Sequence, residues 1–473
     1  MESENFQNHL EDEDRLRKLP DEILLYILEK ANTYTSIRAS FLSTRWRHLP
    51  TLLPHISLET EDFMRSKNTS IFQLVLDEAM SAMTKAVRVC LAVPRRETTM
   101  KTVSLRLCLT AKHLYDIGKL VCEAIDSGKV KSAELFLPTE KFSLDCDVVD
   151  MVQHARNLVY FSEACPNLFR CLTTLSLHNA CFDELQIHCL LNLCEQLQHL
   201  MLNNCDTGDG SVLKLDMPKS KISRLNLRSC RFEKVDFFCL PKLTELHFEC
   251  WFSLNTPFSF GFVPCLDDLH LACAAARYQS GLSLTQLLHG TTNIQALTLD
   301  FQGEKIWMLP EGKKLYTSFN KLNKLFIHGV YVNFGLLWTG ALLEAAPSLK
   351  TFGIKVWDHV YDADSEFRRV FPKRINSWEK NNIISNSRHL QLTRLEFGGF
   401  MAIEKHIEFI RAVMDYAPNL EAILLEDKES CEACEVKGKT CTGSLFPRKK
   451  YEQDMVLTQL GLGACCSVQI IFK

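Results

Sequence analysis

LTTLSLHNACFDELQIHCLLNLCEQLQHLML, residues 172–202, holds the pattern that decides how this chain folds. Leucines stand at positions i, i+3 and i+5 of LTTLSL, and this spacing returns in LQHLML, which begins at residue 197. The last three positions of each copy alternate as in a β-strand that buries one face. The stretch therefore predicts two short strands joined by a return segment.

The return segment has the spacing of a helix. Leu185, Leu190 and Leu193 recur at near-helical intervals, and Asp183 and Glu184 suit the positive end of a helix dipole. We expect this helix to cover the same core as the strands from the other side.

The same motif occurs ten times, which indicates a repeat architecture. Successive copies begin 21 to 28 residues apart, apart from one interval of 43 residues. A period of about 20 to 29 residues is typical of leucine-rich repeats, in which each unit leaves an apolar face for its neighbour to cover. The copies are LTTLSL (172), LQHLML (197), ISRLNL (222), LTELHF (243), LDDLHL (266), IQALTL (294), LNKLFI (322), LKTFGI (349), LTRLEF (392) and LEAILL (420).

The repeats are uneven along the chain. Residues 102–109, 111–128 and 131–137 look like degenerate first repeats, with a helix in the middle segment. The return segment at 228–243 is short and rich in β-branched and aromatic residues, so we expect it to be extended or irregular. The polar interval 358–390 indicates an insertion or a return helix.

Composition and charge exclude several function classes. With 54 basic and 57 acidic residues the net charge is −3, which gives no global attraction to nucleic acid or to a membrane surface. The sequence has no run of about 18 apolar residues, so we expect no membrane span. The acidic N-terminus does not have the pattern of a presequence. We expect the cytoplasm or the nucleus, where the 20 cysteines stay reduced.

Residues 19–49 form a separate apolar segment ahead of the repeats. Pro20 suits the first position of a helix, and Ile23, Leu24, Ile27 and Leu28 form an apolar stripe. Two further short helices are expected from residue 35 and from residue 43. About 30 residues bury too little surface for an independent core, so this segment is expected to dock onto something else.

This segment resembles the F-box, the module that binds the Skp-type linker subunit of cullin-based SCF ubiquitin ligases. The matching residues are Leu19-Pro20, Asp21-Glu22-Ile23-Leu24, Ile27-Leu28, Arg38, Ser40, Leu42-Ser43 and Arg45-Trp46-Arg47. An F-box followed by leucine-rich repeats is similar to plant F-box proteins of the leucine-rich-repeat class, and residues 390–425 are similar to the C-terminal FBD region of that group. The chain departs from the family pattern at Ala31–Thr35 and at Pro50.

The resemblance implies a non-catalytic substrate receptor with a defined set of docking residues. The linker subunit, and through it a cullin, would bind the F-box, while the repeats would bind a target protein. The residues that the resemblance assigns to linker binding are Leu19, Pro20, Ile23, Leu24, Ile27, Leu28, Arg38, Leu42, Ser43, Trp46 and Leu49.

The sequence contains few motifs for catalysis or for cofactor and metal binding. The chain has no phosphate-binding glycine loop, no HExxH motif and no GxSxG motif, so we expect no catalysis and no cofactor. A weak candidate for a zinc site is Cys431, Cys434 and Cys441, against the alternative of a loop with incidental thiols. Aromatic residues after the strands, among them Trp251, Phe252, Trp307, Tyr331 and Trp357, either anchor a ligand at the rim or pack in the core.

The sequence thus predicts an α/β chain in which a short N-terminal three-helix F-box precedes an irregular leucine-rich-repeat solenoid. Two alternatives remain open: a repeat scaffold without a ligase, in which residues 19–49 cap the first repeat, and a small-ligand receptor on the concave repeat face. The predicted segments are a disordered acidic N-terminus (1–15), the F-box (16–58), a helical linker (59–100), leucine-rich repeats (101–389), FBD-like last repeats (390–426), a mobile loop (427–450), and a closing helix with a terminal strand (451–473).

Overall fold

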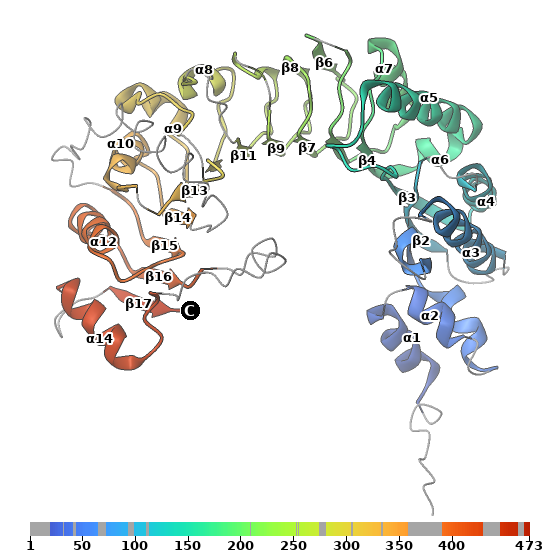
Figure 1. Ribbon diagram of the computed structural model, residues 1–473, viewed down its shortest axis with the longest axis horizontal. Coiled ribbons are helices and arrows are strands. Elements are labelled where there is room, and N and C mark those ends of the chain that lie inside the picture. Colours follow the sequence, from blue (N-terminus) through green and yellow to red (C-terminus); the bar gives the residue numbers. More distant parts are fainter. Residues whose placement is uncertain are drawn as a thin grey trace, which may run out of the picture. The chain divides into compact units, whose positions relative to one another are not determined.

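The chain divides into two units, one of residues 1–179 and 186–197 and the other of residues 180–185 and 198–473. The structure is a computed structural model (Figure 1). It describes residues 19–31, 33–40, 44–64, 72–92, 99–109, 113–208, 210–251, 253, 255–273, 281–303, 306–332, 334–357, 390–428, 445–461 and 468–473.

The first unit begins with three short helical elements and continues as strands that alternate with helices. Strands β1, β2, β3 and β4 are parallel and pair in chain order within the described residues. The elements are α1 (Asp21–Lys30), α2 (Thr33–Ala39), η2 (Trp46–Leu52), β1 (His55–Glu59), η3 (Thr60–Phe63), α3 (Phe72–Ala92), β2 (Met100–Arg106), α4 (Leu114–Asp126), β3 (Val130–Leu137), α5 (Val148–Ala164), α6 (Pro166–Arg170), β4 (Leu172–His178) and α7 (Glu184–Leu193).

The second unit is a parallel sheet whose strands also follow chain order. Its strands are β5 (His199–Asn203), β7 (Arg224–Arg228), β9 (Glu245–Glu249), β11 (Asp268–Ala272), β12 (Ala296–Asp300), β13 (Lys324–Tyr331), β14 (Thr351–Trp357), β15 (Arg394–Gly398), β16 (Ala422–Glu426) and β17 (Gln469–Phe472). Each of the ten sequence motifs contains one strand, so the predicted solenoid of leucine-rich repeats is confirmed. Return helices include α8 (Leu284–Leu287), α9 (Tyr316–Phe319), α10 (Gly340–Ala345), α12 (Glu404–Tyr416) and α14 (Lys450–Gln459).

The motif leucines form the core because they align from strand to strand. Leu225 pairs with Leu246, which pairs with Leu269, and each of these side chains is at most 1% exposed. The alternate positions, such as His247 and His270, lie on the other face of the sheet and are only partly buried. The shared apolar column is what a single repeat lacks and a stack provides.

Left-handed residues end several strands and let the chain turn away from the sheet. Asn179, Asn204, Ser229 and Cys250 all have φ near +50°, a conformation that asparagine tolerates better than most residues. The backbone amide of Asn204 donates to Arg228 O at 2.9 Å, so the ladder of hydrogen bonds continues past the strand. The next residue, for example Cys205, is buried and its thiol donates to Asn203 O.

Three return segments form a second parallel sheet instead of helices. Strands β6 (Val212–Asp216), β8 (Lys234–Cys239) and β10 (Phe258–Phe262) pair in the order β10-β8-β6. In Figure 1, β6 and β8 occupy the outer side of the second unit, next to α8. The extended return predicted at 228–243 is therefore confirmed, whereas the sequence did not predict that its neighbours would pair with it.

The predicted flanking elements also have counterparts. Helix α4 falls within the predicted helix 111–128, α3 lies in the predicted helical linker, and α14 and β17 lie in the C-terminal segment. The predicted F-box segment 16–58 includes most of β1, which pairs with β2 as the first strand of the sheet. Most of the predicted insertion at 358–390 and of the loop at 427–450 lies outside the described residues.

Candidate functional site

Helix α1 carries two apolar stripes that face different surroundings. Leu24 and Leu28 are 0% and 3% exposed, whereas Ile23 and Ile27 are 46% and 37% exposed. Both pairs are spaced by four residues, so each pair lies on one side of the helix. One stripe is buried in the chain's own core, and the other stripe is available to a partner.

The buried stripe belongs to a small core of the N-terminal helices. Leu24 and Leu28 pack with Leu49 of η2 and with Leu53. Partly buried side chains surround this cluster, and they are Leu19, Leu25, Ala39 and Trp46. Leu24, Leu28 and Leu49 thus stabilise the fold of this segment. Only residues outside this core are accessible to a partner in this structure.

Arg45 connects the start of η2 to the start of α1 through hydrogen bonds. The sequence motif did not specify this role. Its Nε and Nη2 atoms donate to Asp21 Oδ1 at 2.9 and 2.7 Å, and Nη2 also donates to Leu19 O at 2.5 Å. These groups are partly exposed, so the ion pair adds at most about 1 kcal/mol to stability. The geometry nevertheless holds the Leu19-Pro20 entry against the start of η2.

The other residues assigned to linker binding occupy the surface or fall outside the described part of the chain. Pro20 and Arg38 are exposed, and Arg38 lies over the Tyr34 ring at 5.7 Å. Leu42 and Ser43 lie outside the described residues. Tyr26, which is 59% exposed on α1, extends the apolar stripe of Ile23 but is absent from the predicted set. Tyr26 stands three residues after Ile23, and this helical spacing could have identified it from the sequence.

The departure from the F-box pattern at Ala31–Thr35 coincides with contacts to the first strand. The Ser57 amide of β1 donates to Thr33 Oγ1 at 2.9 Å, and the Tyr34 ring packs edge-on against Phe63 at 4.9 Å. Ser36 Oγ donates to Leu28 O and so joins α2 to α1. Helix α2 therefore contacts both α1 and the beginning of the sheet.

The face of the second unit's main sheet that lies opposite the leucine core carries mixed charge around a pair of histidines. The imidazole rings of His247 and His270 stack with 5.1 Å between centroids. Burial, and then the nearby His247, lowers the pKa of His270, and burial raises the pKa of Asp268. The ion pair of Arg224 with Glu245, 2.9 Å apart, joins neighbouring strands on this face.

The aromatic residues after the strands divide between core and surface. Trp251 and Trp307 are 4% and 1% exposed and pack edge-to-face, 5.2 Å apart, so they belong to the core. Tyr331 and Trp357 are partly buried, and Phe252 lies outside the described residues. Rim anchoring thus has no support from the two buried tryptophans.

None of the fifteen cysteines that the structure describes is in a disulfide bond. Burial raises the pKa of Cys230 to about 12, so this thiol stays protonated and unreactive near neutral pH. Cys431, Cys434 and Cys441 lie outside the described residues. Within the described ranges no group of three or more His, Cys, Asp or Glu residues is placed to hold a metal ion.

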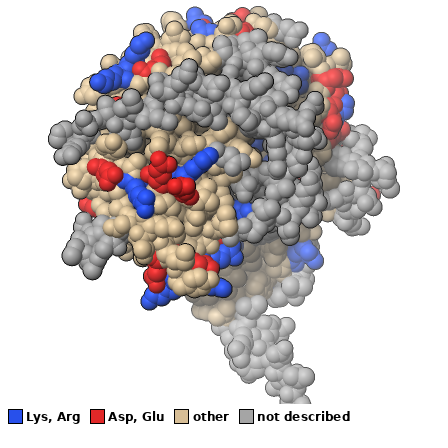
Figure 2. Space-filling model, turned by 60° about the vertical axis from the view of Figure 1, so that its left-hand side comes forward, with Lys and Arg blue, Asp and Glu red and all other residues tan. Residues whose placement is uncertain are grey.

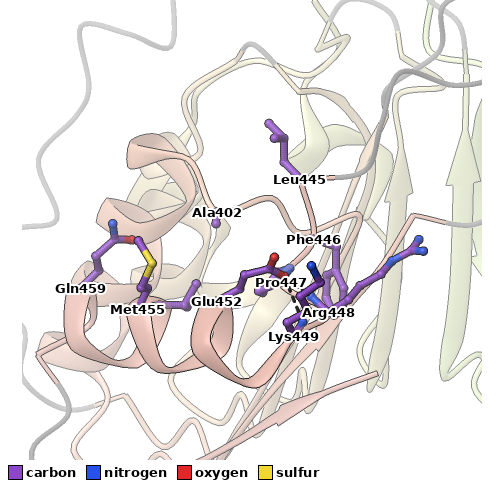
Figure 3. Close-up of a pocket in the computed structure, with 10 residues that line it drawn as sticks. Ala402, Leu445, Phe446, Pro447, Arg448, Lys449, Glu452, Met455 and Gln459 are labelled. Carbon is purple, nitrogen blue, oxygen red and sulfur yellow. Dashed lines mark hydrogen bonds between the residues drawn. The ribbon is translucent and has the colours of Figure 1, made fainter.

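A cavity of about 390 Å³ lies beside α14 (Figure 3). Its charged groups already have partners within the chain. Arg448 Nη2 donates to Asp427 at 2.6 Å, and the Glu452 carboxylate accepts from the Arg448 and Lys449 amides. Apolar residues such as Leu445 and Met455 complete the lining, and no feature there selects a ligand.

On one face of the molecule, the described residues give no electrostatic sign of a nucleic-acid site. On the face shown in Figure 2, acidic and basic side chains lie in mixed groups. None of the described helices combines the length and the apolar character needed to cross a membrane.

Comparisons with known proteins agree with this architecture. A family model described as the At1g61320/AtMIF1 LRR domain matches residues 156–452, and the F-box domain model matches residues 16–54. Relatives include the F-box/FBD/LRR-repeat protein At5g56420 of Arabidopsis thaliana, 23% identical over 58% of this chain and 70% of its own length. At2g04230, also an F-box/FBD/LRR-repeat protein of Arabidopsis thaliana, is 26% identical over 49% of this chain and 51% of its length.

A shorter match to another relative has a higher identity. F-box protein At1g60400 of Arabidopsis thaliana is 46% identical over 50 residues, which are 11% of this chain and 12% of that protein. The repeat model covers more than half of the chain, and the F-box model covers the helices with the exposed stripe. The chain therefore belongs to the At1g61320/AtMIF1 family of leucine-rich-repeat domains and is a plant F-box/LRR protein.

Proposed function

We propose that this protein is the substrate-recognition subunit of an SCF-type E3 ubiquitin ligase, acting in the cytoplasm or the nucleus. F-box/LRR proteins serve in general as adaptors of SCF ligases, and an F-box in general binds a Skp-type linker. The observation that supports the proposal is the exposed stripe of α1, which stays uncovered although the core beneath it is complete. A cullin would join through the linker, and the repeats would hold the target protein.

The mechanism is proximity and needs no chemistry from this chain. Bound to the repeats, a target would have its lysines held near a ubiquitin-charged conjugating enzyme on the same scaffold. Such tethering raises the effective concentration of the reacting groups. The side chains of Ile23 and Ile27 would contribute to docking by burying apolar surface against the linker.

A binding measurement with purified linker subunit tests the proposal. We expect the double variant Ile23→Ser/Ile27→Ser to weaken linker binding about 10- to 100-fold, because buried apolar anchors carry most of the energy of an interface. Its melting temperature should stay near that of the wild type, because both side chains are already exposed. Isothermal titration calorimetry gives the affinity, and differential scanning fluorimetry gives the stability.

Val89→Ser is the matched control, because Val89 is 50% exposed on α3, outside the F-box. It should leave linker binding unchanged. Wild-type protein that does not bind the linker, or an Ile23/Ile27 variant that binds it with full affinity, would contradict the proposal.

The contact between α2 and β1 favours the scaffold alternative in one respect. A segment that only docked a partner would need no bond to the sheet, whereas Thr33 accepts one from Ser57. The F-box thus covers the end of the sheet as well as exposing α1, and the two roles are compatible.

A further inference from the structure

The loop between β3 and α5 exposes an unusual group of large apolar side chains. Phe142 is 82% exposed, Leu144 is 99% exposed, and Val148 and Val149, in the first turn of α5, are 55% and 77% exposed. Single exposed apolar residues are common on proteins, but four of them within residues 142–149 indicate an interaction site. We name these four residues the apolar loop surface.

The loop that carries this surface is held in place from below. The Asn179 side-chain amide, 2% exposed, donates to Thr139 Oγ1 and, at 3.0 Å, to Lys141 O. The amide of Asp145 donates to Phe142 O at 3.0 Å, which closes a turn around Leu144. The exposed side chains therefore project from a fixed backbone, which lowers the entropy cost of binding.

The start of α5 is fixed in the same way. Asp147 and Asp150 form a reciprocal capping box, and Lys141 makes an ion pair with Asp150. Nδ1 of the buried His154 lies 2.8 Å from Asn179 O, so the helix and the loop share one anchor. Val148 and Val149 keep their positions next to the turn for this reason.

The charge around the surface indicates what kind of partner fits. Residues 140–150 contain four acidic groups, Glu140, Asp145, Asp147 and Asp150, and one basic group, Lys141, for a net charge of 1 − 4 = −3. The single lysine is engaged by Asp150. We call these four acidic residues, which flank the apolar ones in the chain, the acidic rim. Together the two sets complement a segment that is apolar and basic.

We infer that the apolar loop surface docks a basic segment of a target protein, whose leucine or phenylalanine side chains contact Phe142 and Leu144 while its lysines or arginines face the acidic rim. The inference names the class of segment that the ligase would recognise and so rests on the proposed function. Recognition by a preformed patch needs neither a metal ion nor a small ligand.

Fluorescence anisotropy with two synthetic peptides tests the inference on the full chain. One labelled 14-residue peptide alternates leucine pairs with lysine pairs, and the other replaces every lysine by glutamate. We expect the lysine peptide to bind wild type at least about 10-fold more tightly than the glutamate peptide. Phe142→Ser/Leu144→Ser should lower binding of the lysine peptide by a similar factor without changing the melting temperature.

Val89→Ser serves as the matched control here too, because Val89 is 50% exposed on α3, outside the loop. It should bind the lysine peptide like wild type. A second variant, Asp145→Asn/Asp147→Asn, should reduce the preference for lysine over glutamate.

Three outcomes would overturn the inference: equal binding of both peptides, equal binding by the Phe142/Leu144 variant, or sedimentation showing that this surface pairs two copies of the chain. Linker binding measured on the same samples separates the two proposals. Loss of peptide selectivity with intact linker binding contradicts only the inference, whereas failure to bind the linker contradicts the proposed function.

Discussion

His406 in α12 is a fully buried histidine in an aromatic environment. Its ring centroid lies 4.8 Å from that of Phe397 and 6.0 Å from that of Phe400, and the Met401 amide lies 3.1 Å from Nδ1. Nε2 has no hydrogen-bond partner among the described residues. Burial, which disfavours the charged ring, lowers the pKa of His406 to about 4, against an ordinary value of 6.5.

This pKa shift predicts that the protein loses stability in mild acid. The unfolded chain binds a proton at His406 below pH 6.5, but the folded chain binds it only near pH 4, so the contribution is complete above pH 6.5. As the pH falls from 6.5 to 4, we expect a loss of about 3 kcal/mol from this residue. Urea unfolding across this pH range should show a flatter pH dependence for His406→Asn. An identical slope in both proteins would contradict the assignment.

Single residues were predicted well where one motif position has one physical role. The motif leucines are buried, as their spacing required. The sequence could not separate Ile23 from Leu24, because both fall on one broad apolar side of a helix. Arg45 is another such case, since its partner Asp21 is 24 residues away in the chain.

Strand β8 contains two adjacent phenylalanines whose side chains lie on opposite faces of the sheet. Phe237 is 0% exposed and stacks with Phe260 of β10 at 5.3 Å, whereas Phe238 is 53% exposed with Lys214 over its ring at 4.4 Å. Alternation along the strand sends the two neighbours to opposite faces. Gly261 of β10 is needed opposite, because a Cβ there would lie 2.5 Å from Phe238 O.

The two neighbours should respond very differently to truncation. Phe237→Ala should destabilise the protein by about 3–5 kcal/mol, because it leaves a cavity in the core. Phe238→Ala should cost about 1 kcal/mol or less, because it removes only a surface cation–π contact. Guanidinium unfolding followed by fluorescence would compare them, and similar losses from both variants would mean that β8 does not have this orientation.

Only the helices and strands with a regular apolar period could be predicted from the sequence. Helices α3, α4, α7 and α12 and the ten motif strands follow from periodicity. Strands β6 and β10 do not, because a five-residue segment such as FSFGF acquires its pairing only from β8, a separate return segment.

In the first unit, the F-box both presents α1 and covers the beginning of the sheet. Ile37 of α2 is 7% exposed, Ile56 of β1 is 2% exposed, and α2 contacts β1. A cut after residue 58 would remove most of β1 itself, so the deletion that isolates the role of the F-box ends at residue 53.

Removing residues 1–53 should lower the melting temperature of the first unit by about 2–8 °C, the shift that a loss of about 1–2 kcal/mol causes in a unit of this size. Thr33→Val, which leaves the Ser57 amide without its acceptor, should produce part of this shift. Calorimetry measures both. An unchanged melting temperature after the deletion would show that the F-box does not cap the sheet.

The sequence by itself determined the repeat architecture, the ten strands and the F-box resemblance, because these depend on side-chain spacing within a few residues. The tertiary structure alone decided which stripe of α1 stays exposed, that three return segments form a second sheet, and that Asn179 holds the loop beneath Phe142 and Leu144. Each of these depends on contacts between segments distant in the chain, and local periodicity carries no information about which segments will meet.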